Sequence, residues 1–245
     1  MEAQRERFRP RCVTRRSLLR MEAMAVIDFE TTGISPNMGD RVTEVAIVLV
    51  EGGKIVDQYQ SLVNAKVHIP YFIEELTGIT NAMIQSAPPP AKVLREMIHF
   101  LGDLPLVAHN ASFDSKFLDA ELALINEERR QEFACSMLLA RRLYPGSPNY
   151  QLGSLVRHLK LPDAKRHHRA LADAQMTAHL LIKLMSDIKD KYNLELVSHK
   201  LLRLIQKAPK AKVQSCIEKA TKAKTSRVAK PCRSPASHSC NNTLQ

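Results

Sequence analysis

The chain has little of what stabilises membrane-embedded or disulfide-linked proteins. Its 245 residues include no tryptophan, 5% aromatic residues and five cysteines, none of them in a Cys-x-x-Cys pair. No apolar run approaches the roughly 18 residues of a membrane-spanning helix, and the Arg-rich start lacks the apolar stretch of a secretory signal. We therefore expect a cytoplasmic protein with reduced thiols and no membrane partner. A zinc site from Cys232, His238 and Cys240 is disfavoured because a second ligand pair and the usual loop spacing are missing.

Positive charge is concentrated at the two ends of the chain, whose formal net charge is +11. Residues 1–20 hold seven Arg against two Glu, and residues 197–245 hold eight Lys and three Arg against one Glu. The intervening residues 21–196 therefore carry a net charge of −4. This distribution indicates that the ends attract a polyanion while the body uses carboxylates. Tails that only aid solubility are the alternative.

Apolar patterning predicts one globular domain with polar ends, since 44% hydrophobic composition is enough for one core. We expect a basic arm over 1–20 that need not be ordered, and a true start at Met21 or Met24. The folded domain should span 21–190, followed by a C-terminal helix over 191–206. Apolar periodicity fades beyond it, which predicts a basic, mostly disordered tail over 207–245.

Strand and helix patterns alternate along this domain. Strands are predicted over 24–29 and 104–110, and a hairpin over 41–51 and 54–63 with its turn at Gly52-Gly53. Helices are predicted over 70–80, 90–101, 112–126, 151–159 and 168–188, with Pro90 and Ser112 at two starts and Gly78 at one end. This order predicts an α/β fold with a mixed central sheet covered by helices.

Two carboxylates end the first predicted strand. Asp28 and Glu30 are two residues apart, so the period of a strand points both to the same side. Two like charges side by side are costly unless a cation joins them. The chain then turns at residues 31–33, which places the pair at a strand's carboxyl end, where α/β sheets usually keep their chemistry. Acidic strand ends are also common on protein surfaces, so this pair alone does not define a site.

Two further acids and a histidine extend the pattern. Asp114 follows the strand over 104–110 and stands in the first turn of a helix, whose dipole favours its charge and also explains it structurally. Asp173 lies in an otherwise apolar helix and must face solvent or a cation. His168 would lie about 140° from Asp173 on a continuous helix. We therefore place His168 at or just before the helix start, turned toward the same site.

Three segments carry a family resemblance. "IDFETTG" (27–33), "HNASFD" (109–114) and "HRALADA" (168–174) resemble the three motifs of the DEDD exonuclease superfamily, in the DEDDh subgroup with His in the third motif. "ELTGIT" (75–80) and "LARRLYPGSPNYQLGSL" (139–155) support a resemblance that covers about 24–186. The family includes the proofreading epsilon subunit of bacterial DNA polymerase III and the exonuclease domain of the Gram-positive replicative polymerase. The resemblance implies a ribonuclease-H-like fold.

The resemblance also implies site residues. Two Mg²⁺ ions, with Mn²⁺ as a substitute, would be held by the four acids Asp28, Glu30, Asp114 and Asp173, and His168 would be the general base. The pocket for the terminal nucleotide would be lined by Thr31, Gly33, Ile34 and Thr77, although epsilon has His at the last position. Glu44 matches a family glutamate, for which we favour a buried hydrogen-bonding role over metal binding. His167 is expected to be a surface neighbour, and His109 and Asn110 could shape the site or contact substrate.

The expected function is a metal-dependent 3′→5′ exonuclease that hydrolyses single-stranded or frayed DNA ends to nucleoside 5′-monophosphates, in proofreading or repair. One alternative is an exoribonuclease that trims RNA, against which "LTGIT" and "NYQLGSL" favour DNA. The other is a non-catalytic nucleic-acid-binding or polymerase-docking subunit, which would have no need for clustered carboxylates. A DNA polymerase subunit is the candidate protein partner, although the sequence shows no convincing sliding-clamp peptide.

Overall fold

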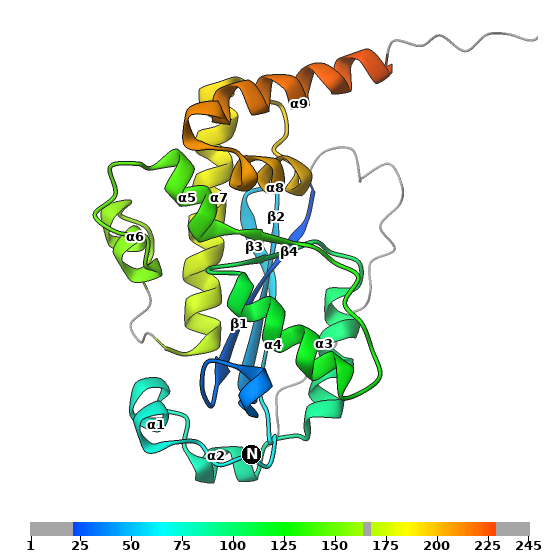
Figure 1. Cartoon of the computed structure of the whole chain (residues 1–245), viewed down its shortest axis with the longest axis vertical. Helices are drawn as coiled ribbons and strands as arrows, with labels where there is room; N and C mark the ends of the chain where they lie inside the picture. Colours follow the sequence, from blue (N-terminus) through cyan, green and yellow to red (C-terminus); the bar gives the residue numbers. More distant parts are fainter. Residues whose placement is uncertain (1–21, 164–167, 229–245) are drawn as a thin grey trace, which may run out of the picture.

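A five-stranded sheet lies at the centre of this computed structural model, which describes residues 22–163 and 168–228, with side chains to residue 221 (Figure 1). The strand order is β3-β2-β1-β4-β5. The strands are β1 (Met24–Thr31), β2 (Val42–Glu51), β3 (Lys54–Leu62), β4 (Leu106–Ala108) and β5 (Phe133–Cys135). β1, β2 and β3 pair antiparallel, whereas β4 is parallel to β1 and β5 to β4. The predicted mixed sheet is confirmed.

The hairpin of β2 and β3 turns where the sequence predicted. Gly52 and Gly53 have φ of 65° and 73°, a backbone conformation that side-chain-bearing residues rarely adopt. Two successive positive φ values match the twist of the flanking strands in a two-residue turn. The turn therefore begins the pairing of β2 with β3 at Glu51 and Lys54. Along its other edge β2 pairs with β1, where Glu44 lies opposite Glu30.

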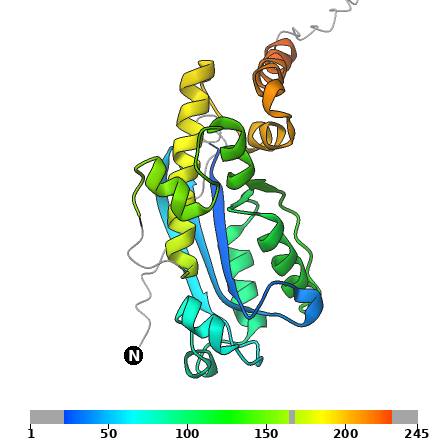
Figure 2. The same cartoon turned by 60° about the vertical axis from the view of Figure 1, so that its left-hand side comes forward.

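Alternate side chains of β1 enter two apolar cores, one on each face of the sheet. Met24 and Val26 join the core on the α7 side, and Ala25 and Ile27 join the core on the other side. Figures 1 and 2 show α7 against one face and α3 and α4 against the other. These helices span Ala170–Tyr192 (α7), Pro90–Leu101 (α3) and Ser112–Ala123 (α4). Asp28 and Glu30 share the parity of Met24 and Val26, so they face α7.

Helix α7 lies close to the sheet because its buried side near the start is built from alanine. Ala170, Ala174 and Ala178, four residues apart, are fully buried in the core that includes Val26 and Ala46. Small side chains at this spacing let the helix backbone approach the strands. The close approach brings Asp173, in the first turn of α7, to the end of β1.

The beginning of the predicted disordered tail is folded. After α8 (His199–Lys207) the chain forms a short 3₁₀ turn, η3 (Lys210–Lys212), and helix α9 (Val213–Val228). Val213 and Ile217, four residues apart, are 5% and 1% exposed in the same core as α7 and α8. With Cys216 and Ala220 packed against the same core, these residues dock a segment whose apolar periodicity looked too weak to fold. The arm over 1–20 and residues 229–245, which include the three residues of the disfavoured zinc site, lie outside the described residues.

Other boundaries differ in detail. α1 (Tyr71–Thr77) ends at Gly78, whose φ of 68° suits glycine, and α6 (Leu152–His158) lies where predicted. Ser112 is the first residue of α4 and not its cap; its hydroxyl donates to the Asn110 side chain at 3.3 Å. α7 extends to Tyr192, so the predicted helix over 191–206 begins later, as α8. The sequence analysis did not predict α2 (Asn81–Gln85), β5 or α5 (Ser136–Leu143).

No helix in the described ranges is both long and apolar enough to cross a membrane.

Candidate active site

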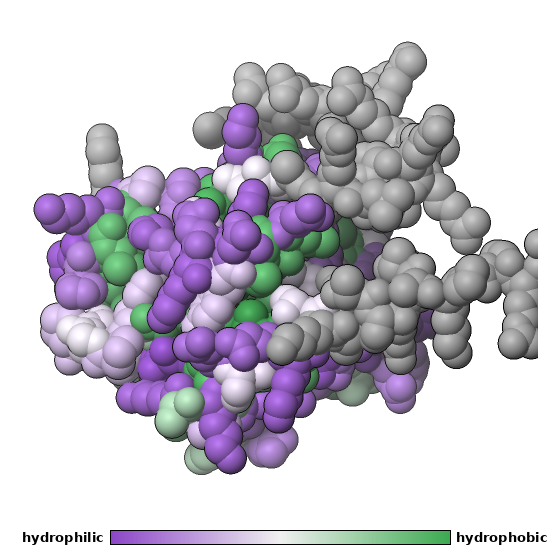
Figure 3. All heavy atoms as spheres, turned by 90° about the horizontal axis from the view of Figure 1, so that it is seen from above, coloured by the Kyte–Doolittle hydropathy of each residue, from purple (hydrophilic) through white to green (hydrophobic). Residues whose placement is uncertain are grey.

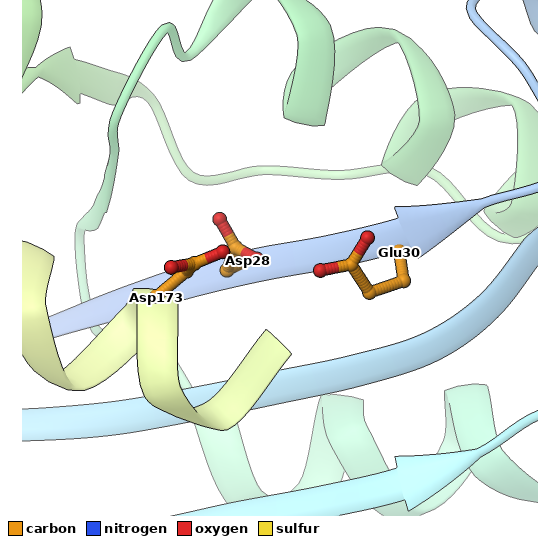
Figure 4. Close-up of side chains that lie close together, drawn as sticks. All are labelled: Asp28, Glu30 and Asp173. Atoms are coloured by element: carbon orange, nitrogen blue, oxygen red, sulfur yellow. The ribbon is translucent and has the colours of Figure 1, made fainter. Parts of the chain in front are cut away.

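Three of the four predicted acids meet at the junction of β1 and α7. Asp28, Glu30 and Asp173 each place a carboxylate oxygen within 4.8 Å of the others (Figure 4). All three side chains are partly exposed, so the cluster is open to solvent on one side. The strand supplies two of the groups through its period of two, and the first turn of the helix supplies the third.

Burial and neighbouring negative charges raise the pKa values of the strand acids. Burial is the main cause of the strong rise in the pKa of Asp28, followed by the charges of Asp114 and Asp173. Burial also raises the pKa of Glu30 to about 8, with further contributions from Asp173 and Glu44 and an opposing one from Arg169. The protein without a bound cation therefore holds protons in this cluster near neutral pH.

Asp114 completes the acidic group from the other side of β1. It stands in the first turn of α4, as predicted, and is 2% exposed. Burial raises its pKa to about 8, although the backbone N–H groups of Asp114 itself and Phe29 act in the opposite direction. β4 pairs with β1 only at Ala25 and Val26, so the later part of β1 is free of strand pairing on this side. The carboxylate of Asp114 fills that place beside Asp28.

The donor set fits a divalent cation. Carboxylate oxygens are the ligands that Mg²⁺ and Mn²⁺ prefer, and a bound cation would offset both the burial and the mutual repulsion that keep protons in the cluster. If these positions served only to fill space, neutral side chains would do so without the repulsion between neighbouring carboxylates. The cluster is therefore a candidate divalent metal site.

His168 lies just before α7, as expected. Its φ is 58°, and its backbone N–H donates to Oδ2 of Asp173 at 3.2 Å. The imidazole is exposed, which leaves it accessible to substrate and water. His167 lies outside the described residues.

Glu44 is buried and hydrogen bonded, as predicted. Its carboxylate accepts from Arg169, the backbone of Ala170 and the side chain of Gln60. Burial would raise the pKa of Glu44, but these donors outweigh burial and hold it below its ordinary value. Sequence reasoning missed Arg169, whose partner is 125 residues away along the chain.

The residues expected at the nucleotide pocket have different environments. Ile34 is 82% exposed, beside the acids on the chain that leaves β1. A Cβ at Gly33 would collide with the carboxylate of Asp40, which explains the glycine. The hydroxyl of Thr31 donates to Gly33 O at 2.6 Å, and Thr31 is buried. Thr77 is also buried, donating to Ile73 O and accepting from the Ile79 N–H. Ile34 is thus the most accessible of the four, and their contact with substrate stays a prediction.

His109 is held by hydrogen bonds at both of its ring nitrogens. Its Nε2 faces the Tyr150 carbonyl at 2.9 Å, so it must carry the proton, and its Nδ1 lies 2.8 Å from the Ser136 hydroxyl. Burial lowers the pKa of His109 to about 4, so the ring is neutral and ties β4 to the loop before α6. Asn110 is exposed with φ of 69° at the start of α4.

A mixed sheet with clustered carboxylates between its first strand and a covering helix defines a ribonuclease-H-like nuclease domain. A family model described as "Exonuclease" (RNase T) matches residues 25–181, more than half of the chain. The chain belongs to this family, in its DEDDh 3′–5′ exonuclease group.

Two curated relatives show the same relationship. The chain is 40% identical over 176 residues to "DNA polymerase III PolC-type" of Bacillus subtilis (strain 168), covering 71% of this chain but 12% of that protein. It is 35% identical to "3'-5' exonuclease DinG" of the same organism, covering 69% of this chain and 18% of the relative. The chain therefore corresponds to a small part of each of these proteins.

Among solved structures, Exonuclease X in complex with 5′ overhanging duplex DNA is similar, with 34% identity and a TM-score of 0.56. The match covers 70% of this chain and 93% of that one. The nuclease domain of 3′hExo, a DEDDh family member, shares the fold at 21% identity and a TM-score of 0.59, covering 69% of this chain and 93% of that one.

Stability should fall as pH rises when no divalent cation is present. The folded protein holds Glu30 and Asp114 with pKa values of about 8, against ordinary values of 4.5 and 3.8. At these two groups the folded state therefore binds more protons than the unfolded chain between about pH 4 and pH 8, so their contribution to stability falls with each rise in pH. The low pKa of His109 acts in the opposite direction mainly below about pH 6.5. We expect the Tm measured in EDTA to fall between pH 6 and pH 8.5. In an assay buffer that contains about 10 mM Mg²⁺, we expect the Tm to fall less over the same pH range. Equal pH dependence with and without Mg²⁺ would contradict the metal assignment.

Proposed function

We propose that this protein removes nucleotides one at a time from the 3′ end of DNA by hydrolysis with two divalent cations, Mg²⁺ or Mn²⁺. The observation that carries the proposal is the approach of Asp28, Glu30 and Asp173 to within 4.8 Å. These three acids and Asp114 would hold the cations. When bound, such ions activate water and stabilise a departing oxygen.

The residues of the chain supply the remaining steps. His168 accepts the proton of the attacking water, because the unprotonated nitrogen of a neutral imidazole is a base. The water oxygen bonds to phosphorus as the bond from phosphorus to the 3′ oxygen breaks. The products are a nucleoside 5′-monophosphate and a strand with a new 3′ hydroxyl. The hydrogen bond from the His168 backbone to Asp173 keeps the base and a cation ligand together.

Relatives favour DNA as the substrate. A match to a replicative polymerase at 40% identity and a match to a DNA-bound exonuclease at 34% identity support action on DNA ends. The relation to a polymerase also supports proofreading, with a DNA polymerase subunit as partner. Repair by the free protein is the other role consistent with this activity.

Digestion of end-labelled oligonucleotides tests the proposal. With Mg²⁺, DNA labelled at its 5′ end should give a ladder that shortens from the 3′ end, and EDTA should stop it. Asp28→Ala should lower the rate to background, because it removes a cation ligand that no neighbour replaces. The variant should be as stable as the unsubstituted protein or more stable in EDTA, since repulsion is relieved.

Matched RNA and DNA strands complete this experiment. If RNA is digested faster than DNA, RNA becomes the proposed substrate in place of DNA. Full activity of Asp28→Ala, or of the unsubstituted protein in EDTA, would overturn the metal-dependent mechanism.

His168 should matter far more than its neighbour. His168→Ala should lose a factor of roughly 10²–10⁴ in turnover, the usual span for removal of a general base, while cation binding persists. His167→Ala is the matched control and should change turnover little. Turnover of both variants is measured at saturating substrate. A large loss in His167→Ala with little change in His168→Ala would identify His167 as the general base instead.

A cluster of exposed lysines lies at the far end of α7 from the acids. α7 has 23 residues, so its end is roughly 30 Å from Asp173 at 1.5 Å per residue. Figures 1 and 2 show α9 at this end, and Figure 3 views the molecule from it, with hydrophilic side chains over much of the described surface. Four of the exposed lysines lie between the end of α8 and α9: Lys207, Lys210, Lys212 and Lys219. We propose that they bind phosphates of a longer strand.

The distance makes this testable by substrate length. About nine stacked nucleotides span 30 Å at about 3.4 Å each, so a 20-mer can reach both places, whereas a trinucleotide is too short to do so even when it is unstacked and extended. Changing the four lysines to Gln should raise KM for the 20-mer and flatten its salt dependence, by about 0.7 for each phosphate that the variant no longer neutralises. Turnover of the 20-mer at saturation and all constants for the trinucleotide should stay the same. Equal salt slopes for the 20-mer would exclude binding of the strand by these lysines.

A further inference from the structure

A buried ion pair lies directly beside the acidic cluster. The Glu44 side chain is fully buried, and that of Arg169 is 23% exposed. Arg169 donates through Nε at 3.1 Å and Nη2 at 2.7 Å to the two carboxylate oxygens of Glu44. The Ala170 N–H donates to the same carboxylate at 3.0 Å and Gln60 Nε2 at 2.7 Å. Four donors from β3 and the start of α7 therefore converge on one carboxylate of β2.

This pair joins the start of α7, which carries Asp173, to β2, the strand that pairs with β1. Glu44 lies opposite Glu30 in the register of β1 and β2, where two like charges would destabilise the sheet without a counter-charge. Arg169 supplies that charge and is the N-cap of α7. The Asp173 N–H donates to the Arg169 carbonyl at 3.0 Å, so both residues belong to one helical turn. Fixing Arg169 on Glu44 therefore fixes the turn that presents Asp173.

We propose that Arg169 and Glu44 are positioning residues that hold Asp173 at the separation from Asp28 and Glu30 that a divalent cation requires. The inference rests on the proposed function, because it takes the ligand of the cluster to be such a cation. Neither residue needs to touch the cation or the substrate: the carboxylate of Glu44 is already filled by its four donors.

An effect of charge alone and a loss of positioning predict opposite changes in cation affinity for the variant Arg169→Gln. Arg169→Gln removes a positive charge near the cluster, so electrostatics alone would make cation binding tighter. Glu44→Gln removes a negative charge, so electrostatics alone would make it weaker. Loss of position weakens binding in both variants. The direction of the change in Arg169→Gln therefore separates the two explanations.

Calorimetric titration with Mn²⁺ in the absence of nucleic acid measures this directly. We expect the Kd for Mn²⁺ to rise roughly 10–100-fold in Arg169→Gln and in Glu44→Gln, the usual range for residues that orient a metal ligand. Arg169→Lys should also weaken binding, because one ammonium does not reproduce the two-pronged contact of a guanidinium. Circular dichroism and Tm in EDTA establish that each variant is folded.

Arg129→Gln is the matched control. Arg129 makes a similar two-pronged contact with Asp119, at 2.7 and 2.9 Å, and its side chain is 20% exposed. The pair links α4 to the following loop, on the other face of the sheet from α7. Its loss should lower Tm and leave the Kd for Mn²⁺ unchanged.

The outcomes separate the two proposals. Tighter binding in Arg169→Gln, or unchanged binding in Arg169→Lys, would reduce the pair to a charge effect and overturn the positioning role. Unchanged Kd in Arg169→Gln and Glu44→Gln, with binding by the unsubstituted protein, would overturn this inference alone. No binding by the unsubstituted protein would overturn the proposed function and this inference with it.

Discussion

Repulsion among carboxylates that the fold forces together is the constraint on which this structure depends. Asp28, Glu30 and Asp173 lie within 4.8 Å of one another, and the charge of Asp114 also acts on Asp28. Without a cation, the cluster keeps protons: burial raises the pKa values of Glu30 and Asp114 to about 8, and the negative charges of Asp173 and Glu44 add to the rise for Glu30. A site that is costly when empty and ionised is one that gains much from a cation.

The surrounding architecture serves to maintain that arrangement. The parity of β1 turns two acids toward α7, and the alanines of α7 let its first turn approach the strand. β4 ends early, so that the start of α4 can place Asp114 beside the unpaired part of β1. Glu44, which would add a further negative charge, is instead neutralised by Arg169. Each of these features brings acids together or limits the cost of doing so.

Local patterns in the sequence predicted much of this arrangement. The period of two placed Asp28 and Glu30 on one side, and positions in helical turns placed Asp114 and Asp173. Convergence of these segments on one site came from the family resemblance, because strand and helix periodicities do not say which segments meet. Neither local patterns nor the family resemblance indicated the individual contacts between residues that are far apart in the sequence. Arg169 binds Glu44 across 125 residues, and the partners of His109 are 27 and 41 residues away.

The misses have similar physical causes. Residues 207–228 looked too polar to fold, but two buried residues, Val213 and Ile217, dock α9 on a core already formed by α7 and α8. Ser112 has a residue type that suits a cap, yet the backbone enters the helix one residue earlier. Both outcomes depend on tertiary packing and backbone dihedral angles, which composition does not specify.

Proton release on cation binding tests the central claim most directly. At pH 7, titration with Mg²⁺ or Mn²⁺ by calorimetry in buffers of different ionisation enthalpy reports the protons released for each cation bound. Because groups with pKa values of about 8 are mostly protonated at pH 7 and must ionise to act as ligands, we predict binding with net proton release. The release should shrink toward pH 9. Binding without proton release, or no binding, would contradict an acidic cluster built to hold a divalent cation.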